Sequence, residues 1–229
     1  MNPTDVVVER VASIRAEIAA VERPWDHEVE LVAVTKGFGP EAIEAAAAAG
    51  CRAIGENYAQ ELLAKRATVE LVGVDVQFIG RLQSNKVRKL VGLVDLWASL
   101  DRPSVVDEVA RRDPGAAVLV QVNSTGEEQK GGCEPAAVGR LVERARAAGL
   151  VVRGLMTVGP TVGSAERARP GFRLVRRLTD ELGLVECSMG MTADLHVAVE
   201  EGSTSVRLGT ALFGPRPGAG VTPGDAPVR

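Results

Sequence analysis

Short apolar runs of strand length alternate with helix-length segments along most of this chain, and this alternation limits the folds open to it. Eight such runs span residues 30–35, 52–54, 76–79, 94–98, 117–122, 151–157, 184–188 and 204–208. The segments between them carry helix start and stop residues, such as Pro40 before and Gly50 after an alanine-rich stretch. Strands that are joined by helices pair in parallel.

This order of elements predicts an α/β fold with a single (β/α)8 TIM barrel. An open doubly wound sheet is the alternative, because periodicity alone does not show that a sheet closes. An extra helix over residues 5–21 precedes the first strand, within a lead-in of residues 1–28. We expect residues 1–229 to form one domain, with a flexible Gly- and Pro-rich tail at 215–229.

The composition argues against several classes of partner. Lys and Arg number 27 against 30 Asp and Glu, a net charge of -3, so we expect neither nucleic-acid nor membrane binding. The three cysteines lie far apart without metal-ligand spacing, so we expect no disulfide and no metal site. The N-terminus lacks the long apolar stretch of a signal peptide. We therefore expect a cytoplasmic protein, and a monomer because its own helices cover the barrel.

The first strand ends in a lysine. Strand alternation places Val32, Val34 and Lys36 on one face. If that face points inward, Lys36 lies in the barrel mouth, where desolvation lowers its pKa and makes the amine a usable nucleophile. The alternative is a solvated lysine at a strand end.

The last two strands offer groups that bind anions. Alternation points Arg207 and Gly209 inward on the eighth strand, and Thr210 follows with a hydroxyl. Ser188 ends the seventh strand, and this fold often binds phosphate after strands 7 and 8. Residues 202–204 precede the eighth strand, so we expect them to form a turn at the opposite mouth.

Each of these features has a simpler interpretation by itself. A Gly-Thr pair is usually a turn, and an inward arginine is often part of a structural salt bridge. Together, an amine at the barrel mouth and an anion cradle across from it match what pyridoxal 5'-phosphate requires, because the amine captures the aldehyde and the cradle holds the phosphate.

Seven segments then identify a family. AVTKGF, IGENYAQEL, FIGRLQSNKVRKL, QVNSTGEEQKGG, RGLMTVGP, SMGMTADLHVAVEEGST and VRLGTALFG occur in this order. They closely resemble the pyridoxal phosphate homeostasis protein family, and the resemblance runs from Val29 to Gly214. Two departures stand out: Gln77 replaces a histidine that many members carry, and Thr192 replaces a serine. Neither change undermines cofactor binding, since Gln77 lies mid-motif and Thr192 keeps a hydroxyl.

The resemblance implies a single-domain barrel similar to the N-terminal domain of alanine racemase, with the cofactor as an internal aldimine on Lys36. It implies that Asn57 lies beside the cofactor and that Arg207 faces the pyridine nitrogen. It also implies that Ser188, Gly209 and Thr210 hold the phosphate. The family is associated with intracellular vitamin B6 and amino-acid homeostasis.

Three hypotheses follow. The first is a regulatory protein that holds pyridoxal 5'-phosphate on Lys36 as a Schiff base, without robust turnover, and passes it to apo enzymes that depend on it. A cationic Arg207 supports this hypothesis, because it disfavours the protonated ring nitrogen on which such enzymes rely. The second is an amino-acid racemase or lyase that uses the same cofactor. The third is a barrel that binds another phosphorylated metabolite without a covalent link.

Candidate acids and bases for turnover have other interpretations. A racemase of this fold needs a second acid/base, which the resemblance assigns to a tyrosine from an additional domain and a partner subunit. We expect no such domain here, and the chain's one tyrosine, Tyr58, follows the second strand. We expect His27 and His196 to be surface or helix-packing residues, and Asp194 to start a helix. The loop Gly126–Gly132 after the fifth strand is expected at the functional mouth, either as a gate or as a solvated loop.

Overall fold

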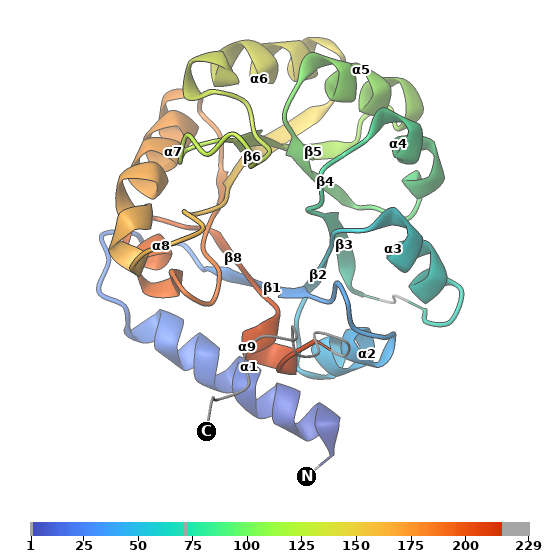
Figure 1. Cartoon of the computed structure of the whole chain (residues 1–229), viewed down its shortest axis with the longest axis vertical. Coiled ribbons are helices and arrows are strands. Elements are labelled where there is room, and N and C mark those ends of the chain that lie inside the picture. Colours follow the sequence, from blue (N-terminus) through green and yellow to red (C-terminus); the bar gives the residue numbers. More distant parts are fainter. Residues whose placement is uncertain (1, 71–72, 217–229) are drawn as a thin grey trace, which may run out of the picture.

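The computed structural model of the chain is a ring of eight strands with helices outside it (Figure 1). It describes residues 2–70 and 73–216. The strands follow one another round the ring in chain order, and each is parallel to its neighbours. The predicted TIM barrel is confirmed, and the open doubly wound alternative is wrong.

The element bounds are as follows. The strands are β1 Glu30–Val34, β2 Ala53–Glu56, β3 Asp75–Phe78, β4 Leu96–Leu100, β5 Ala117–Val122, β6 Val151–Thr157, β7 Glu186–Ser188 and β8 Ser205–Leu208. The helices are α1 Pro3–Ala20, α2 Glu41–Ala48, α3 Ala59–Arg66, α4 Ser84–Leu90, α5 Pro103–Arg112, α6 Val138–Ala147, α7 Arg169–Glu181, α8 Leu195–Glu200 and α9 Thr210–Phe213.

The extra N-terminal helix is confirmed as α1, and it lies outside the ring (Figure 1). Asn2 caps it through a side-chain bond to the Thr4 amide, and Pro3 occupies its first turn. The helix packs on α2, α8 and α9. Arg10 strengthens that contact, because its Nη1 donates to the Leu212 carbonyl at 2.8 Å.

Strand alternation divides the apolar residues between two cores. Leu31 and Ala33 of β1 belong to the large cluster between the barrel and the helices. A smaller cluster of Leu96, Ala98, Leu119 and Met156 fills the barrel interior. Gly55 of β2 faces the interior too, since a Cβ built on it would lie 3.2 Å from the side chain of Val34. The predicted inward face of β1 is therefore confirmed.

The second strand differs from the prediction, which ended at Ile54. It continues through Gly55 and Glu56, two residues that are poor strand formers. Gly55 fits because Val32 and Val34 already occupy the space that its side chain would need. Glu56 is tolerated because its buried carboxylate pairs with Lys65. Packing and pairing, rather than local propensity, extend this strand.

Two further expectations concern the chain ends and membranes. From residue 217 onward, the expected flexible tail lies outside the described residues. Among the helices of residues 2–70 and 73–216, none has the length and apolar character needed to cross a bilayer.

Candidate functional site

The six predicted cofactor residues lie on, or within two residues after, four neighbouring strands of the ring, β7, β8, β1 and β2. They are Lys36, Asn57, Ser188, Arg207, Gly209 and Thr210. The register pairs Val34 with Gly55 and Ala33 with Leu208, so the residues that follow these strands meet at one edge. The structure therefore brings all six to the carboxyl-terminal mouth of the barrel, where this fold places its working residues.

Lys36 follows β1 and is half-buried. Burial lowers the pKa of its amine, and the positive charges of Arg216 and Arg207 lower it further. The carboxylates of Glu56 and Glu61 oppose this shift. Because a lowered pKa leaves more of the neutral amine near neutral pH, Lys36 is suited to attack a carbonyl carbon.

Arg207 lies inside the mouth and is almost completely buried. Its Nη1 donates to Ser188 Oγ at 2.6 Å, and its Nη2 donates to the Thr157 carbonyl at 2.6 Å. Burial lowers the pKa of its guanidinium to about 10, so the group stays charged at neutral pH. Arg207 thus presents a fixed positive charge and also orients the Ser188 hydroxyl.

Asp194 is the carboxylate that acts most strongly on Arg207. Burial raises the pKa of Asp194, while the Met191 amide, which donates to its Oδ1 at 2.6 Å, and Arg207 lower it. The residue precedes α8 as predicted, but its side chain does not cap that helix. The short bond to Met191 holds the carboxylate instead.

Gly209 and Thr210 follow β8 directly beside β1. A Cβ built on Gly209 would lie 3.2 Å from the Val34 carbonyl, so a larger residue would press on β1 just before Lys36. Thr210 is exposed and begins α9. In the described part of the chain its amide has no hydrogen-bond acceptor, as expected for the first turn of a helix. An anion at this point meets a free N–H and a hydroxyl.

Asn57 lines a pocket of about 310 Å³ together with Tyr58, Gln83 and Lys86. The pocket joins the segments after β2 and β3 at the same mouth. Tyr58 is 53% exposed, so it stands at the rim and not inside the barrel. Gln83 and Lys86, which belong to the segment FIGRLQSNKVRKL, are neighbours of Asn57 in this pocket.

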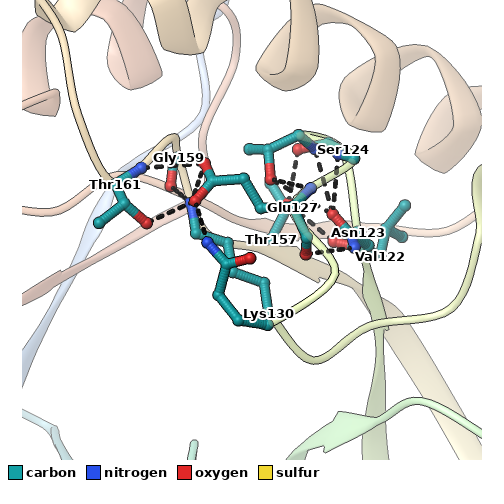
Figure 2. Close-up of polar contacts among 11 residues, drawn as sticks. Val122, Asn123, Ser124, Glu127, Lys130, Thr157, Gly159 and Thr161 are labelled. Carbon is teal, nitrogen blue, oxygen red and sulfur yellow. Dashed lines mark hydrogen bonds and ion pairs between the residues drawn. The ribbon is translucent and has the colours of Figure 1, made fainter.

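The loop after β5 is tied to the loop after β6 (Figure 2). Glu127 accepts from Lys130 Nζ at 2.9 Å and from the Thr161 hydroxyl at 2.6 Å. These hydrogen bonds lower the pKa of Glu127 to about 2. Lys130 also donates to the Gly159 carbonyl. Hydrogen bonds and an ion pair therefore hold the Gly126–Gly132 loop to the loop after β6 at this mouth, and its predicted location is confirmed.

Thr157, at the end of β6, connects the last residue of β5 to Arg207. Its carbonyl accepts from Arg207, and its hydroxyl donates to the Val122 carbonyl at 2.9 Å (Figure 2). The sequence analysis missed Thr157 because its contribution to Arg207 is a main-chain oxygen. It also missed the ion pair of Glu56 on β2 with Lys65 on α3.

Both histidines lie away from this mouth. His27 Nε2 is 3.0 Å from the Ser203 carbonyl, at the amino-terminal end of β8. His196 lies on the outside of α8 and pairs with Glu17 of α1. The predicted turn at 202–204 is confirmed at the opposite mouth.

Known proteins resemble the chain over nearly its whole length. A family model described as the alanine racemase N-terminal domain matches residues 10–217. The pyridoxal phosphate homeostasis protein of Aquifex aeolicus is 42% identical over 91% of this chain and 97% of its own length. That of Pseudomonas aeruginosa is 37% identical, over 92% and 96%. PipY of Synechococcus elongatus PCC7942, solved with PLP bound, is 32% identical with a TM-score of 0.77, over 90% and 99%.

Proposed function

Because this chain belongs to the pyridoxal phosphate homeostasis protein family, we propose that it binds pyridoxal 5'-phosphate as a Schiff base on Lys36. Its role is then to hold this reactive aldehyde reversibly and to supply it to apo enzymes, within the vitamin B6 balance of the cell. The binding unit in this proposal is one barrel domain acting as a monomer.

One observation carries the proposal: a half-buried amine with a lowered pKa lies at the barrel mouth, beside a strand that carries a buried cation. The register sets this arrangement, since β1 and β8 are hydrogen-bonded neighbours and Val32 pairs with Arg207. The residues present fit the cofactor, because its aldehyde and its phosphate need an amine and anion-binding groups at one site.

The covalent step needs no oxidant or second substrate. The neutral amine of Lys36 adds to the aldehyde carbon, a carbon–nitrogen double bond forms, and the carbonyl oxygen leaves as water. The step reverses in water, so a protein that works in this way can release the aldehyde unchanged. Reversibility suits storage and delivery.

In this proposal the other candidates act through hydrogen bonds and charge. Thr210 donates its amide and hydroxyl to the phosphate, Gly209 leaves room for it, and the Ser188 hydroxyl, oriented by Arg207, contributes a third donor. Asn57 borders the ring from β2. Arg207 faces the ring nitrogen as a cation.

Arg207 also bears on turnover. The cofactor supplies an electron sink to enzymes when its ring nitrogen is protonated. A buried cation facing that nitrogen disfavours protonation, so Arg207 preserves binding and weakens carbanion chemistry. This is the physical reason for proposing a carrier, with an amino-acid racemase or lyase as the competing function.

Borohydride reduction of the holoprotein followed by peptide mass spectrometry tests the proposal. We expect a reduced pyridoxyl phosphate adduct on Lys36 and on no other lysine, and we expect Lys36→Ala to lose both the adduct and the yellow colour. Lys89→Ala, at an exposed position of α4, is the control and should keep both. An adduct that persists in Lys36→Ala would refute the assignment, and a colourless wild-type protein would favour a non-covalent phosphorylated ligand.

A further inference from the structure

A buried ion pair is hydrogen-bonded to Thr35, the residue before Lys36. Lys65 of α3 donates to Glu56 of β2 at 2.6 Å, and the two side chains are 5% and 0% exposed. Pairs buried in this way are weak sources of stability, because desolvation of both charges offsets their attraction and apolar residues of similar size often serve as well. The contacts that the pair makes therefore need an explanation other than stability.

Those contacts end on the residue before Lys36. Thr35 Oγ1 donates to Glu56 Oε1 at 2.6 Å, and Lys65 Nζ donates to the Thr35 carbonyl at 2.7 Å. The Thr35 amide donates to the Gly55 carbonyl at 3.1 Å. Thr35 thus has its amide, its carbonyl and its hydroxyl all engaged, and it is completely buried.

A second carboxylate, that of Glu61 on α3, holds the residue after Lys36. Glu61 Oε2 accepts from the Gly37 amide at 2.8 Å and lies 3.9 Å from Lys65 Nζ. Gly37 has a φ of +74°, a conformation that favours glycine and turns the chain sharply after the amine. The network therefore has two arms, one on each side of Lys36.

We propose that Glu56, Lys65 and Glu61 are positioning residues for Lys36. By fixing the peptide units on both sides, they fix the direction in which the Lys36 side chain leaves the backbone, toward Arg207 and Gly209. None of the three touches the cofactor in this proposal, which rests on the proposed function of Lys36. One oxygen of Glu56, Oε2, is buried and has no hydrogen-bond partner among the described residues. The Glu56 carboxylate therefore bonds Thr35 and Lys65 through Oε1 and leaves Oε2 without a partner.

Two variants test the two arms. Glu61→Ala removes the acceptor of the Gly37 amide and leaves the buried pair intact, so this variant should fold. Glu56→Gln combined with Lys65→Met removes both buried charges together, which avoids an uncompensated charge. Asp180→Asn is the control, because Asp180 pairs with Arg176 of α7, whose guanidinium also contacts the Gly202 carbonyl near the opposite mouth.

The first measurement uses the protein without cofactor. Amide hydrogen exchange by NMR should show faster exchange at Gly37 in Glu61→Ala and unchanged exchange there in Asp180→Asn. The second measurement is the rate at which added pyridoxal 5'-phosphate becomes fixed to Lys36 by borohydride. We expect this rate to fall about tenfold in Glu61→Ala and in the double variant, since small displacements of a reacting group cost large factors.

Glu61→Gln separates the hydrogen bond to the Gly37 amide from the negative charge of Glu61. Its carboxamide oxygen still accepts from Gly37, so we expect most of the lost rate to return. If Glu61→Ala folds, keeps slow exchange at Gly37 and loads at the wild-type rate, the positioning role is wrong, whether or not the double variant folds. If wild-type protein forms no adduct at Lys36, the proposed function fails, while the exchange data still show whether Glu61 holds the loop.

Discussion

Lys36 differs from the other lysines of the chain in its surroundings. Burial and two nearby arginines lower its pKa, whereas Lys89 projects from α4 into solvent. The neutral amine is the reactive form, so a lowered pKa moves the onset of reactivity to lower pH. We expect reductive methylation of the apo protein by formaldehyde and cyanoborohydride to modify Lys36 with a midpoint below that of a lysine in an added reference peptide.

Peptide mass spectrometry across a pH series measures both midpoints in one sample. The reference peptide provides the internal control because it experiences the same reagent. A Lys36 midpoint at or above that of the peptide lysine would show that the environment of Lys36 does not activate its amine.

Thr210 makes a second residue-scale prediction. Thr210→Val removes a hydroxyl donor to a charged acceptor and keeps the side-chain shape, so cofactor binding should weaken by about 1.5–3 kcal/mol if the bond is direct. That corresponds to a rise in Kd of about tenfold to a hundredfold. Equilibrium dialysis of the cofactor measures it, with Thr210→Ser as the variant that retains the donor. An unchanged Kd removes Thr210 from the phosphate cradle.

The alternation of side chains along each strand predicted the direction of the candidate side chains well. Alternation along β1 and β8 directs Lys36 and Arg207 toward the interior, since it needs only the strand and its buried face. It could not identify Thr157, because the relevant group is a carbonyl oxygen that every residue possesses. It could not pair Glu56 with Lys65 either, since that contact depends on how α3 packs against β2.

At the scale of elements, the loop after β5 depends on one carboxylate. Glu127 joins Lys130 to Thr161 and so holds residues 126–132 against the loop after β6 (Figure 2). We expect Glu127→Ala to release this loop and to speed trypsin cleavage after Lys130 several-fold, because cleavage requires local opening. Mass spectrometry of a timed digest measures the cleavage at this bond.

Glu128 supplies the matched control for that experiment. It is the next residue, it is exposed, and its side chain makes no hydrogen bond within residues 2–70 and 73–216. Glu128→Gln should leave the cleavage rate at the wild-type value. Equal rates in the two variants would mean that the Glu127 contacts do not hold the loop.

The strand boundaries show what local sequence misses at this scale. The runs at 117–122 and 151–157 match β5 and β6, and both stretches are rich in aliphatic residues. β4 runs from Leu96 to Leu100, so it begins and ends two residues later than the predicted 94–98. Just before it, Asp95 accepts from the Val76 amide through its carboxylate at 2.7 Å and donates its own amide to the Val76 carbonyl at 2.9 Å. Tertiary contacts set these boundaries.

At the scale of the whole molecule, the count of eight strands favoured a barrel but did not show that the sheet closes. Closure appears only in the pairing of β1 with β8, which joins residues near the two ends of the described chain. The same pairing brings Lys36 beside Gly209. The candidate site is therefore a consequence of closure, and an open sheet of the same strands would separate its amine from its anion cradle.

The last prediction concerns turnover by the complete holoprotein. Racemisation by this cofactor is favoured by a protonated ring nitrogen and uses a second acid/base across the ring. Arg207 opposes protonation of that nitrogen. For the second acid/base, His27 and His196 lie away from the mouth, and Tyr58 stands exposed at its rim. We expect holoprotein incubated with alanine in deuterated water to show no α-proton exchange beyond that of an equal concentration of free cofactor, as measured by proton NMR. Sustained exchange that disappears in Lys36→Ala would establish the chain as a pyridoxal enzyme, and the role of Arg207 argued above would then be wrong.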